Sequence, residues 1–427
     1  MAEAVHGAHT TTPRAMTTAD GTPLKVALAR ATRRNKVRAF LLVAPLLLFI
    51  MITFIFPIVQ MLLRSVDNPE VSAAIPETAA LLAEWDGTDL PPEAVFASLA
   101  KEMSDRKEGQ RQNLGRMGAR LNYEDGGFRS LINKTSRRIR RVTEGPYKEA
   151  FIKIDEDWGK TETWKTIQYA SAPITVSYYL NAVDRTFDAD GNVVMQPEWK
   201  QIYVQLFWKT IYVSFGVTLA CLILAYPIAY MLATLPTATS NLLLILVLLP
   251  FWTSLLVRTT SWIVLLQTQG VINDTLVFIG ILSDENRIEM IYNMTGTIIA
   301  MTHILLPFMV LPMYSVMKGI SPSYMRAARS LGANPLIAFL RVYMPQTVPG
   351  IGAGSILVFI LAIGYYITPA LVGGQDGQLI SNFIAYHMQR SLNWGLAAAL
   401  GTILLALVLL MYWLYDRIVG IDNMKLG

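Results

Sequence analysis

The chain is poor in the residue types that build most catalytic and metal sites. Its 427 residues include one cysteine, Cys221, and four histidines, so no disulfide can form within the chain and no metal-ligand spacing is present. The sequence shows no nucleophile–base pair. Gly350, Gly352 and Gly354 lie in an apolar run, where close helix packing explains them better than nucleotide binding does. We therefore predict no catalytic residue, no metal and no cofactor held by this chain.

Charged residues are also scarce. They make up 16% of the chain, whereas 53% is hydrophobic and the mean hydropathy is +0.39, which is typical of a membrane protein. Crossing a bilayer takes about 20 apolar residues, and six runs are long enough: residues 40–63, 210–235, 241–267, 295–317, 346–372 and 391–415. Arg258, in the third run, is the one Asp, Glu, Lys or Arg among them. We predict an all-α membrane protein with six transmembrane helices.

The flanks of these runs predict the orientation. The residues before the first run include Lys25, Arg30, Arg33, Arg34, Lys36 and Arg38. No acidic residue lies among them, so the N-terminus should be cytoplasmic. Six crossings return the C-terminus to the same side. We expect residues 1–39 to be a largely disordered cytoplasmic tail, residues 40–63 the first transmembrane helix, and residues 421–427 a short cytoplasmic tail.

Residues 64–200 form a long polar insert between the first two runs, large enough for a small domain. Long loops cross the membrane regardless of charge, so we expect this one to be periplasmic. Helices are predicted at 93–120 and 128–141 and strands at 173–180 and 192–195, which makes a mixed α/β domain. Asp188, Asp190 and Asn192 resemble the start of a calcium loop, but Trp199 stands where its glutamate belongs, and a turn is predicted. The arginine cluster at 137–141 is interpreted as a solvated face, not a nucleic-acid site.

A short loop at residues 318–345 has the signals of two consecutive helices. Ser321-Pro322 predicts an N-cap followed by proline at the first helical position. Gly332 can end that helix in a left-handed conformation, and Asn334-Pro335 starts the next one. The loop is basic and has no Asp or Glu, which favours a cytoplasmic location. Its alanines leave room for a partner to approach closely.

This loop resembles the EAA loop of ABC-importer permeases. The resemblance lies in Arg326-Ala327-Ala328, Gly332, Val342 and Met344-Pro345. The chain departs from the pattern at Arg326, where glutamate is usual, and at Met344, where leucine is usual. The resemblance implies that Arg326, Ala327, Ala328, Gly332 and Pro345 couple this chain to an ATPase.

A longer resemblance, over residues 208–410, is to the polyamine (spermidine/putrescine) branch of these permeases. It rests on LPFWTSLLVR at 249–258, QGVIN at 269–273, ILLPFMVLPMY at 304–314 and ITPALVGG at 367–374. It implies a five-helix type I importer core at 201–420 preceded by one helix, in a bacterial inner membrane. It also implies a second permease, two ATPase subunits that bind ATP and Mg, and a periplasmic substrate-binding protein. The insert at 64–200 lies outside the compact family pattern.

The solute is less well defined by the sequence. A polyamine path needs aromatic faces and carboxylates. Trp252, Tyr365 and Tyr366 supply the aromatic faces and Asp376 a carboxylate, whereas Arg258 suits an anionic or zwitterionic solute or a structural role. These five residues are the candidate translocation path. His303, also in an apolar run, is interpreted as a polar link to a neighbouring helix or as a gating residue.

Polyamine import is therefore the first hypothesis, and import of an opine or an amino-acid conjugate is the second. A secondary transporter would need intramembrane acidic residues, which the runs lack. A membrane receptor would need a cytoplasmic output domain, and the predicted tails are short.

Overall fold

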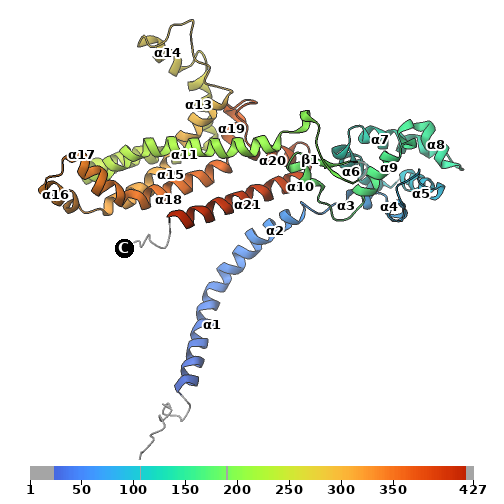
Figure 1. Ribbon diagram of the computed structural model, residues 1–427, viewed down its shortest axis with the longest axis horizontal. Coiled ribbons are helices and arrows are strands. Elements are labelled where there is room, and N and C mark those ends of the chain that lie inside the picture. Colours follow the sequence, from blue (N-terminus) through green and yellow to red (C-terminus); the bar gives the residue numbers. More distant parts are fainter. Residues whose placement is uncertain (1–23, 106, 189–190, 420–427) are drawn as a thin grey trace, which may run out of the picture. The chain divides into compact units, whose positions relative to one another are not determined.

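The computed structural model describes residues 24–105, 107–188 and 191–419 and is mostly helical (Figure 1). In these ranges strand is limited to β1 (Arg185–Phe187) and β2 (Val193–Met195), paired antiparallel. The chain divides into two compact units, the first ending at Met61 and the second starting at Leu62. The predicted helical character is thus confirmed in outline.

The described part of the first unit is one long helix that is apolar from Phe40 onward. It consists of α1 (Leu24–Ile50), a short π-helical segment (Met51–Ile55) and the start of α2 (Phe56–Leu63). Residues 24–39 are helical and not the disordered tail that we predicted, because this stretch lacks Pro and Gly and is rich in the helix formers Ala, Leu, Lys and Arg. The rest of that tail, residues 1–23, and the tail at 421–427 lie outside the described residues.

The insert folds around its own apolar core, within the second unit. Its helices are α3 (Pro69–Ser72), α4 (Pro76–Ala83), α5 (Glu93–Ser104), α6 (Glu108–Glu124), α7 (Phe128–Arg138), α8 (Tyr147–Ile154), α9 (Thr161–Ala170) and α10 (Ser177–Ala182). Four buried rings lie at the centre, where Phe96 contacts Phe151 and Trp164, and Phe151 contacts Trp158 edge-on at 5.1 Å. Edge-to-face packing of this kind stabilises a core beyond area burial alone.

The prediction of a mixed α/β insert is not confirmed. The strand expected at 173–180 is wrong, because α10 starts at Ser177 and buries Tyr178, Asn181 and Ala182 at helical spacing against the C-terminal helix α21 (Trp394–Val419). The strand expected at 192–195 is confirmed as β2. Its turn is held by Asp188, whose Oδ1 accepts a hydrogen bond from the Asn192 amide at 2.8 Å. Asp190 lies outside the described residues.

Three long helices form the centre of the remaining part of the second unit. They are α11 (Tyr203–Thr234), α15 (Met294–Gly319) and α18 (Met344–Ile363), which lie side by side (Figure 1). A Cβ atom at Gly350 would lie 3.1 Å from the Met313 Cα, and one at Gly354 would lie 3.1 Å from the Met309 carbonyl. The glycines at the start of α18 therefore permit close helix packing, as predicted.

Two of the six predicted runs are broken in the structure. The third bends by 98° between α12 (Thr237–Leu248) and the pair α13 (Leu255–Leu266) and α14 (Val271–Phe278), with a 3-10 turn, Leu249–Trp252, at the bend. Pro250 lacks an amide hydrogen, and Ser254 starts α13 by accepting a hydrogen bond from the Val257 amide. The fifth run is interrupted after Ile363, and α19 (Ile367–Val372) and α20 (Ile380–Gln389) follow. The described chain thus has five helices able to span a membrane, or six if the bent pair counts as one span.

Candidate functional site

The loop between α15 and α18 has the local structure that its sequence predicted. It contains α16 (Pro322–Ser330), α17 (Pro335–Ala338) and a π-helical segment, Phe339–Tyr343. Ser321 caps α16, and Asn334 caps α17 by accepting a hydrogen bond from the Ile337 amide at 2.8 Å. Gly332 has a φ of +88°, and no atom lies within 4 Å of the position that a Cβ would take. The turn therefore needs glycine for its backbone conformation alone.

This loop presents apolar side chains to solvent. Leu331 is 89% exposed, and Tyr324 and Leu336 are also exposed. Arg326 and Ala327 are exposed beside them, and so is Pro345 in the first turn of α18, whereas Ala328 is half-buried. Exposed apolar side chains on a short loop are a common feature of protein-binding surfaces.

Aromatic stacking fixes the base of this loop to the bundle. Phe339 stacks on Tyr343 with ring centroids 5.6 Å apart, and both rings contact Tyr230 of α11 edge-on. The base of the loop is therefore packed directly against α11.

Polar residues of α13, α15 and α19 meet between the helices. The Trp262 indole donates a hydrogen bond to Nδ1 of His303 at 3.0 Å, and the hydroxyls of Thr259 and Thr368 lie 3.3 Å apart. Arg258 lies close enough to His303 and Tyr365 for electrostatic interaction. The structure thus brings Arg258 and Tyr365 together, two of the five predicted path residues.

Arg258 is unusual in this cluster because its guanidinium forms no ion pair with the described residues. Its Nε and Nη1 atoms are buried and have no hydrogen-bond partner in the described part of the chain. Burying a guanidinium nitrogen without an acceptor is unfavourable. These two nitrogens are therefore available to donate hydrogen bonds to water, to a bound solute or to another subunit.

The other three path residues lie apart from Arg258. Trp252 is 82% exposed at the bend after α12, and Tyr366 is exposed between α18 and α19. Asp376 is exposed in the loop between α19 and α20 and interacts electrostatically with Lys209 of α11. Sequence analysis missed Lys209 because it immediately precedes the second apolar run. The signal available in the sequence was the position of this lysine directly before the apolar run at 210–235.

A hydrogen-bonded seam joins the start of α11 to α20. The Tyr203 hydroxyl lies 2.8 Å from Nε2 of His387, and Nδ1 of His387 lies 2.8 Å from the Ser391 hydroxyl. Asp184 caps α11 by accepting hydrogen bonds from the amides of residues 202, 203 and 204. Burial lowers the pKa of His387 to about 4. Sequence reasoning did not identify this seam, because its members are far apart in the chain.

Known proteins resemble the C-terminal half of the chain. A family model described as "Binding-protein-dependent transport system inner membrane component" matches residues 216–419. The spermidine/putrescine transport system permease protein PotB of Escherichia coli (strain K12) is 37% identical over 222 residues, which cover 51% of this chain and 80% of that protein. The PotB protein of Haemophilus influenzae is 35% identical over 251 residues, covering 58% of this chain and 82% of that protein. A crystal structure of a bacterial ABC transporter that imports alginate aligns with a TM-score of 0.43 at 18% identity, over 52% of this chain and 81% of that one.

Proposed function

Since this chain belongs to the family of binding-protein-dependent transport inner membrane components and is the non-catalytic permease subunit of an ABC importer, we propose that it carries polyamines or a related small organic solute. The observation that carries this proposal is the identity of 35–37% to spermidine/putrescine permeases, over most of their length. ATP is bound by a separate ATPase chain, so this subunit contributes the path and its coupling to the ATPase.

The loop at residues 318–345 is proposed to dock on that ATPase. The exposed Leu331 and Tyr324 support this assignment, and so does the ring packing that ties Phe339 to α11. Arg326, Ala327, Ala328, Gly332 and Pro345 are the proposed coupling residues. The importer includes a periplasmic binding protein, and we propose a second permease and two ATPase subunits as the further partners.

The proposed topology places both termini in the cytoplasm and the insert in the periplasm. The basic residues before the first run support this orientation. The proposed division is a tail at 1–39, a transmembrane helix at 40–63, an insert at 64–200, a permease core at 201–420 with its coupling loop, and a tail at 421–427. In this topology the insert lies where the binding protein docks.

The proposed translocation path passes Arg258 and Tyr365 between α13 and α19. An aromatic face holds an alkylammonium ion by about 0.5–2 kcal/mol, which Tyr365 could supply. Trp252, Tyr366 and Asp376 are exposed in this chain alone, and in the importer they would line the outer mouth or face the second permease. Its carboxylates would then supply the acceptor that Arg258 lacks.

One observation favours the second candidate function, import of an anionic or zwitterionic solute such as an opine or amino-acid conjugate. The buried nitrogens of Arg258 have no acceptor in the described chain, and a solute carboxylate would satisfy them bidentately. On this alternative Arg258 binds the solute directly and does not pair with a partner subunit.

Reconstitution of the importer tests the two candidates against each other. The permease pair, ATPase and binding protein are placed in proteoliposomes, and uptake of radiolabelled putrescine and spermidine is measured with and without ATP. We expect ATP-dependent polyamine uptake that excess opine does not inhibit. Uptake of opine, with no polyamine uptake under the same conditions, would establish the second candidate. The isolated chain should show no ATPase activity.

A further inference from the structure

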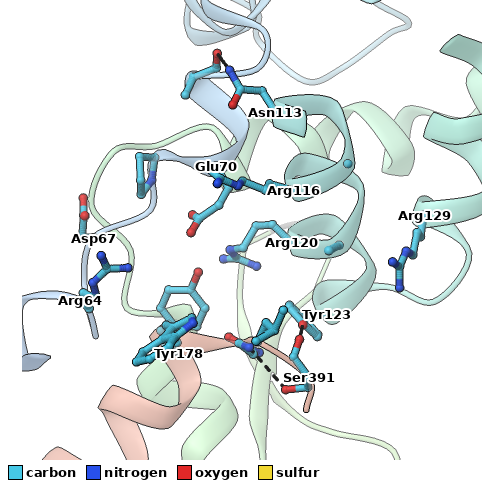
Figure 2. A pocket seen from close by; sticks show the side chains of 18 of the residues that line it. Arg64, Asp67, Glu70, Asn113, Arg116, Arg120, Tyr123, Arg129, Tyr178 and Ser391 are labelled. Atoms are coloured by element: carbon cyan, nitrogen blue, oxygen red, sulfur yellow. Dashed lines mark hydrogen bonds between the residues drawn. The ribbon is translucent and has the colours of Figure 1, made fainter. Parts of the chain in front are cut away.

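A pocket of about 950 Å³ lies where the insert meets the permease core. The helices α3 and α6 form one side of it and the connection between α20 and α21 forms the other (Figure 2). Neither the family assignment nor the path residues account for this pocket.

Positive charge dominates the pocket. Five arginines line it: Arg64, Arg116, Arg120, Arg129 and Arg390. Among them Arg120 is satisfied, because its Nη1 pairs with Glu124 at 2.6 Å and its Nε donates to Asn68 at 2.7 Å. The guanidinium groups of the other four form no ion pair in the described residues, and the two carboxylates that line the pocket, Asp67 and Glu70, are too few to balance them. A cavity with this excess of guanidinium groups attracts an anion.

The pocket also holds an unsatisfied acceptor. The Oε2 atom of Glu70 is buried and has no hydrogen-bond partner among the described residues, although the carboxylate interacts electrostatically with Arg120. Figure 2 shows the Glu70 carboxylate pointing into the space between Arg116, Arg120 and Tyr178. A buried carboxylate oxygen needs a donor. The complementary ligand therefore carries an anionic group together with an N–H or O–H donor.

The pocket lies at the end of a candidate membrane span, Trp394–Arg417. The helix α21 starts at Trp394, and its first charged residue is Asp416. About 20 residues cross the hydrocarbon core, so we expect Trp394 to lie at the boundary with the headgroups. Trp394 is 41% exposed and Leu392 is 64% exposed at the rim of the pocket, and aromatic residues are enriched at this depth. Arg64, which also lines the pocket, directly follows the last residue of α2.

We propose that this pocket binds the headgroup of a membrane phospholipid. Arg116 and Arg390 hold the phosphodiester, since a guanidinium binds phosphate oxygens bidentately. The amine or hydroxyl of the headgroup donates to Glu70, and the acyl chains leave past Leu392 and Trp394 into the bilayer. Phosphatidylethanolamine and phosphatidylglycerol carry such a donor, whereas phosphatidylcholine does not. The bound lipid joins the insert to the permease core at the membrane surface.

Native mass spectrometry of the full chain, released from nanodiscs of defined composition, tests this site. Nanodiscs contain equal parts of phosphatidylethanolamine, phosphatidylglycerol and phosphatidylcholine. We expect the wild-type chain to retain the first two lipids over the third. The double variant Arg116→Ala, Arg390→Ala should retain at least five-fold less lipid than the wild type. Glu70→Gln should discriminate less strongly between phosphatidylcholine and the other two lipids. Arg390→Gln alone serves if the double variant misfolds.

A matched control is available on the same helix. Arg111 is an exposed arginine of α6 that does not line the pocket, so Arg111→Ala should retain lipid as the wild type does. Equal retention by the double variant and the wild type would contradict the proposal, and so would displacement of the lipid by millimolar inorganic phosphate, which would indicate a small-anion site. A double variant that keeps its lipid but loses stimulation by the binding protein would instead identify a protein-docking site.

Discussion

The hydroxyl of Tyr123 in α6 donates a hydrogen bond to the backbone carbonyl of Ser391, 268 residues later, at a distance of 2.6 Å. This bond joins the insert to the connection between α20 and α21. Beside it Tyr178 of α10 packs against Gly395, where a Cβ would lie only 2.3 Å from two ring atoms. The insert therefore contacts the permease core through a specific hydrogen bond and through close packing of a ring against a glycine.

Substitution of Gly395 tests how much these contacts between the insert and the permease core stabilise the protein. Gly395→Ala forces the Tyr178 ring or α21 to move, and overpacking of this kind destabilises by about 1–3 kcal/mol. We expect a lower midpoint of thermal unfolding for the full chain in detergent. Gly401→Ala is the matched control, because Gly401 lies on the same helix with no atom within 4 Å of its Cβ position. Equal midpoints for Gly395→Ala and wild type would show that Tyr178 packs less closely against Gly395 than the structure indicates.

Gly332 tests the coupling loop. Its φ of +88° costs a β-branched residue roughly 1–2 kcal/mol or more, so Gly332→Val should displace the turn between α16 and α17. We expect normal membrane insertion with loss of uptake and of binding-protein-stimulated ATPase activity in the reconstituted importer.

Asparagine provides the control at this position, since it adopts the left-handed conformation more readily than valine does. Gly332→Asn should retain most of the coupled activity. Wild-type uptake in Gly332→Val would remove the turn from the coupling mechanism.

Single cysteines test the proposed topology. In a Cys221→Ala background, Ser130→Cys places a thiol on the exposed surface of α7, and Ser323→Cys places one on exposed α16. We expect a membrane-impermeant maleimide to label residue 130 in intact spheroplasts and residue 323 only after lysis. The reverse pattern would invert the topology, and labelling of both positions in intact cells would contradict a six-span arrangement.

The path residues can be tested individually in uptake assays. Tyr365→Ala, Trp252→Ala and Asp376→Ala should each weaken polyamine uptake several-fold at normal expression. Each aromatic face holds an alkylammonium ion by about 0.5–2 kcal/mol, and Asp376 attracts the ion through the charge of its carboxylate. Trp208→Ala is the control, since Trp208 is an exposed tryptophan of α11 outside the proposed path. Wild-type kinetics in all three variants would place the path elsewhere and leave these residues as interfacial anchors.

The burial of His387 predicts that the free energy of unfolding of the protein depends on pH. Its pKa is lowered by burial from 6.5 to about 4, and its ring nitrogens contact the hydroxyls of Tyr203 and Ser391. Between those two values the unfolded chain binds a proton that the folded chain does not, so the free energy of unfolding falls as the pH falls. The loss at pH 4 is at most about 3 kcal/mol.

The measurement compares wild type with His387→Gln, which keeps a neutral polar side chain at this position. Unfolding midpoints from pH 7 to pH 4.5 should decrease more steeply for the wild type. Carboxylates titrate in both proteins, so the difference between the two slopes isolates the imidazole. Parallel slopes would contradict a buried neutral His387.

The sequence by itself determined the class of the protein and its local turns. Apolar runs of about 20 residues have few stable alternatives to membrane helices, and the caps at Ser321 and Asn334 depend on neighbouring atoms only, so both could be predicted. The family could be identified from residues 208–410 because the resemblance to known permeases rests on contiguous segments of the chain. These predictions needed no knowledge of which segments meet in space.

The tertiary structure decided what depends on such meetings. The break at Pro250 and the end of α18 at Ile363 went unpredicted, because hydropathy does not distinguish a straight span from a bent one. The 177–182 segment became a helix because it packs against α21, which outweighs its local strand preference. The arginine pocket draws its residues from positions 64 to 395, and only folding brings residues so far apart in the chain to one cavity.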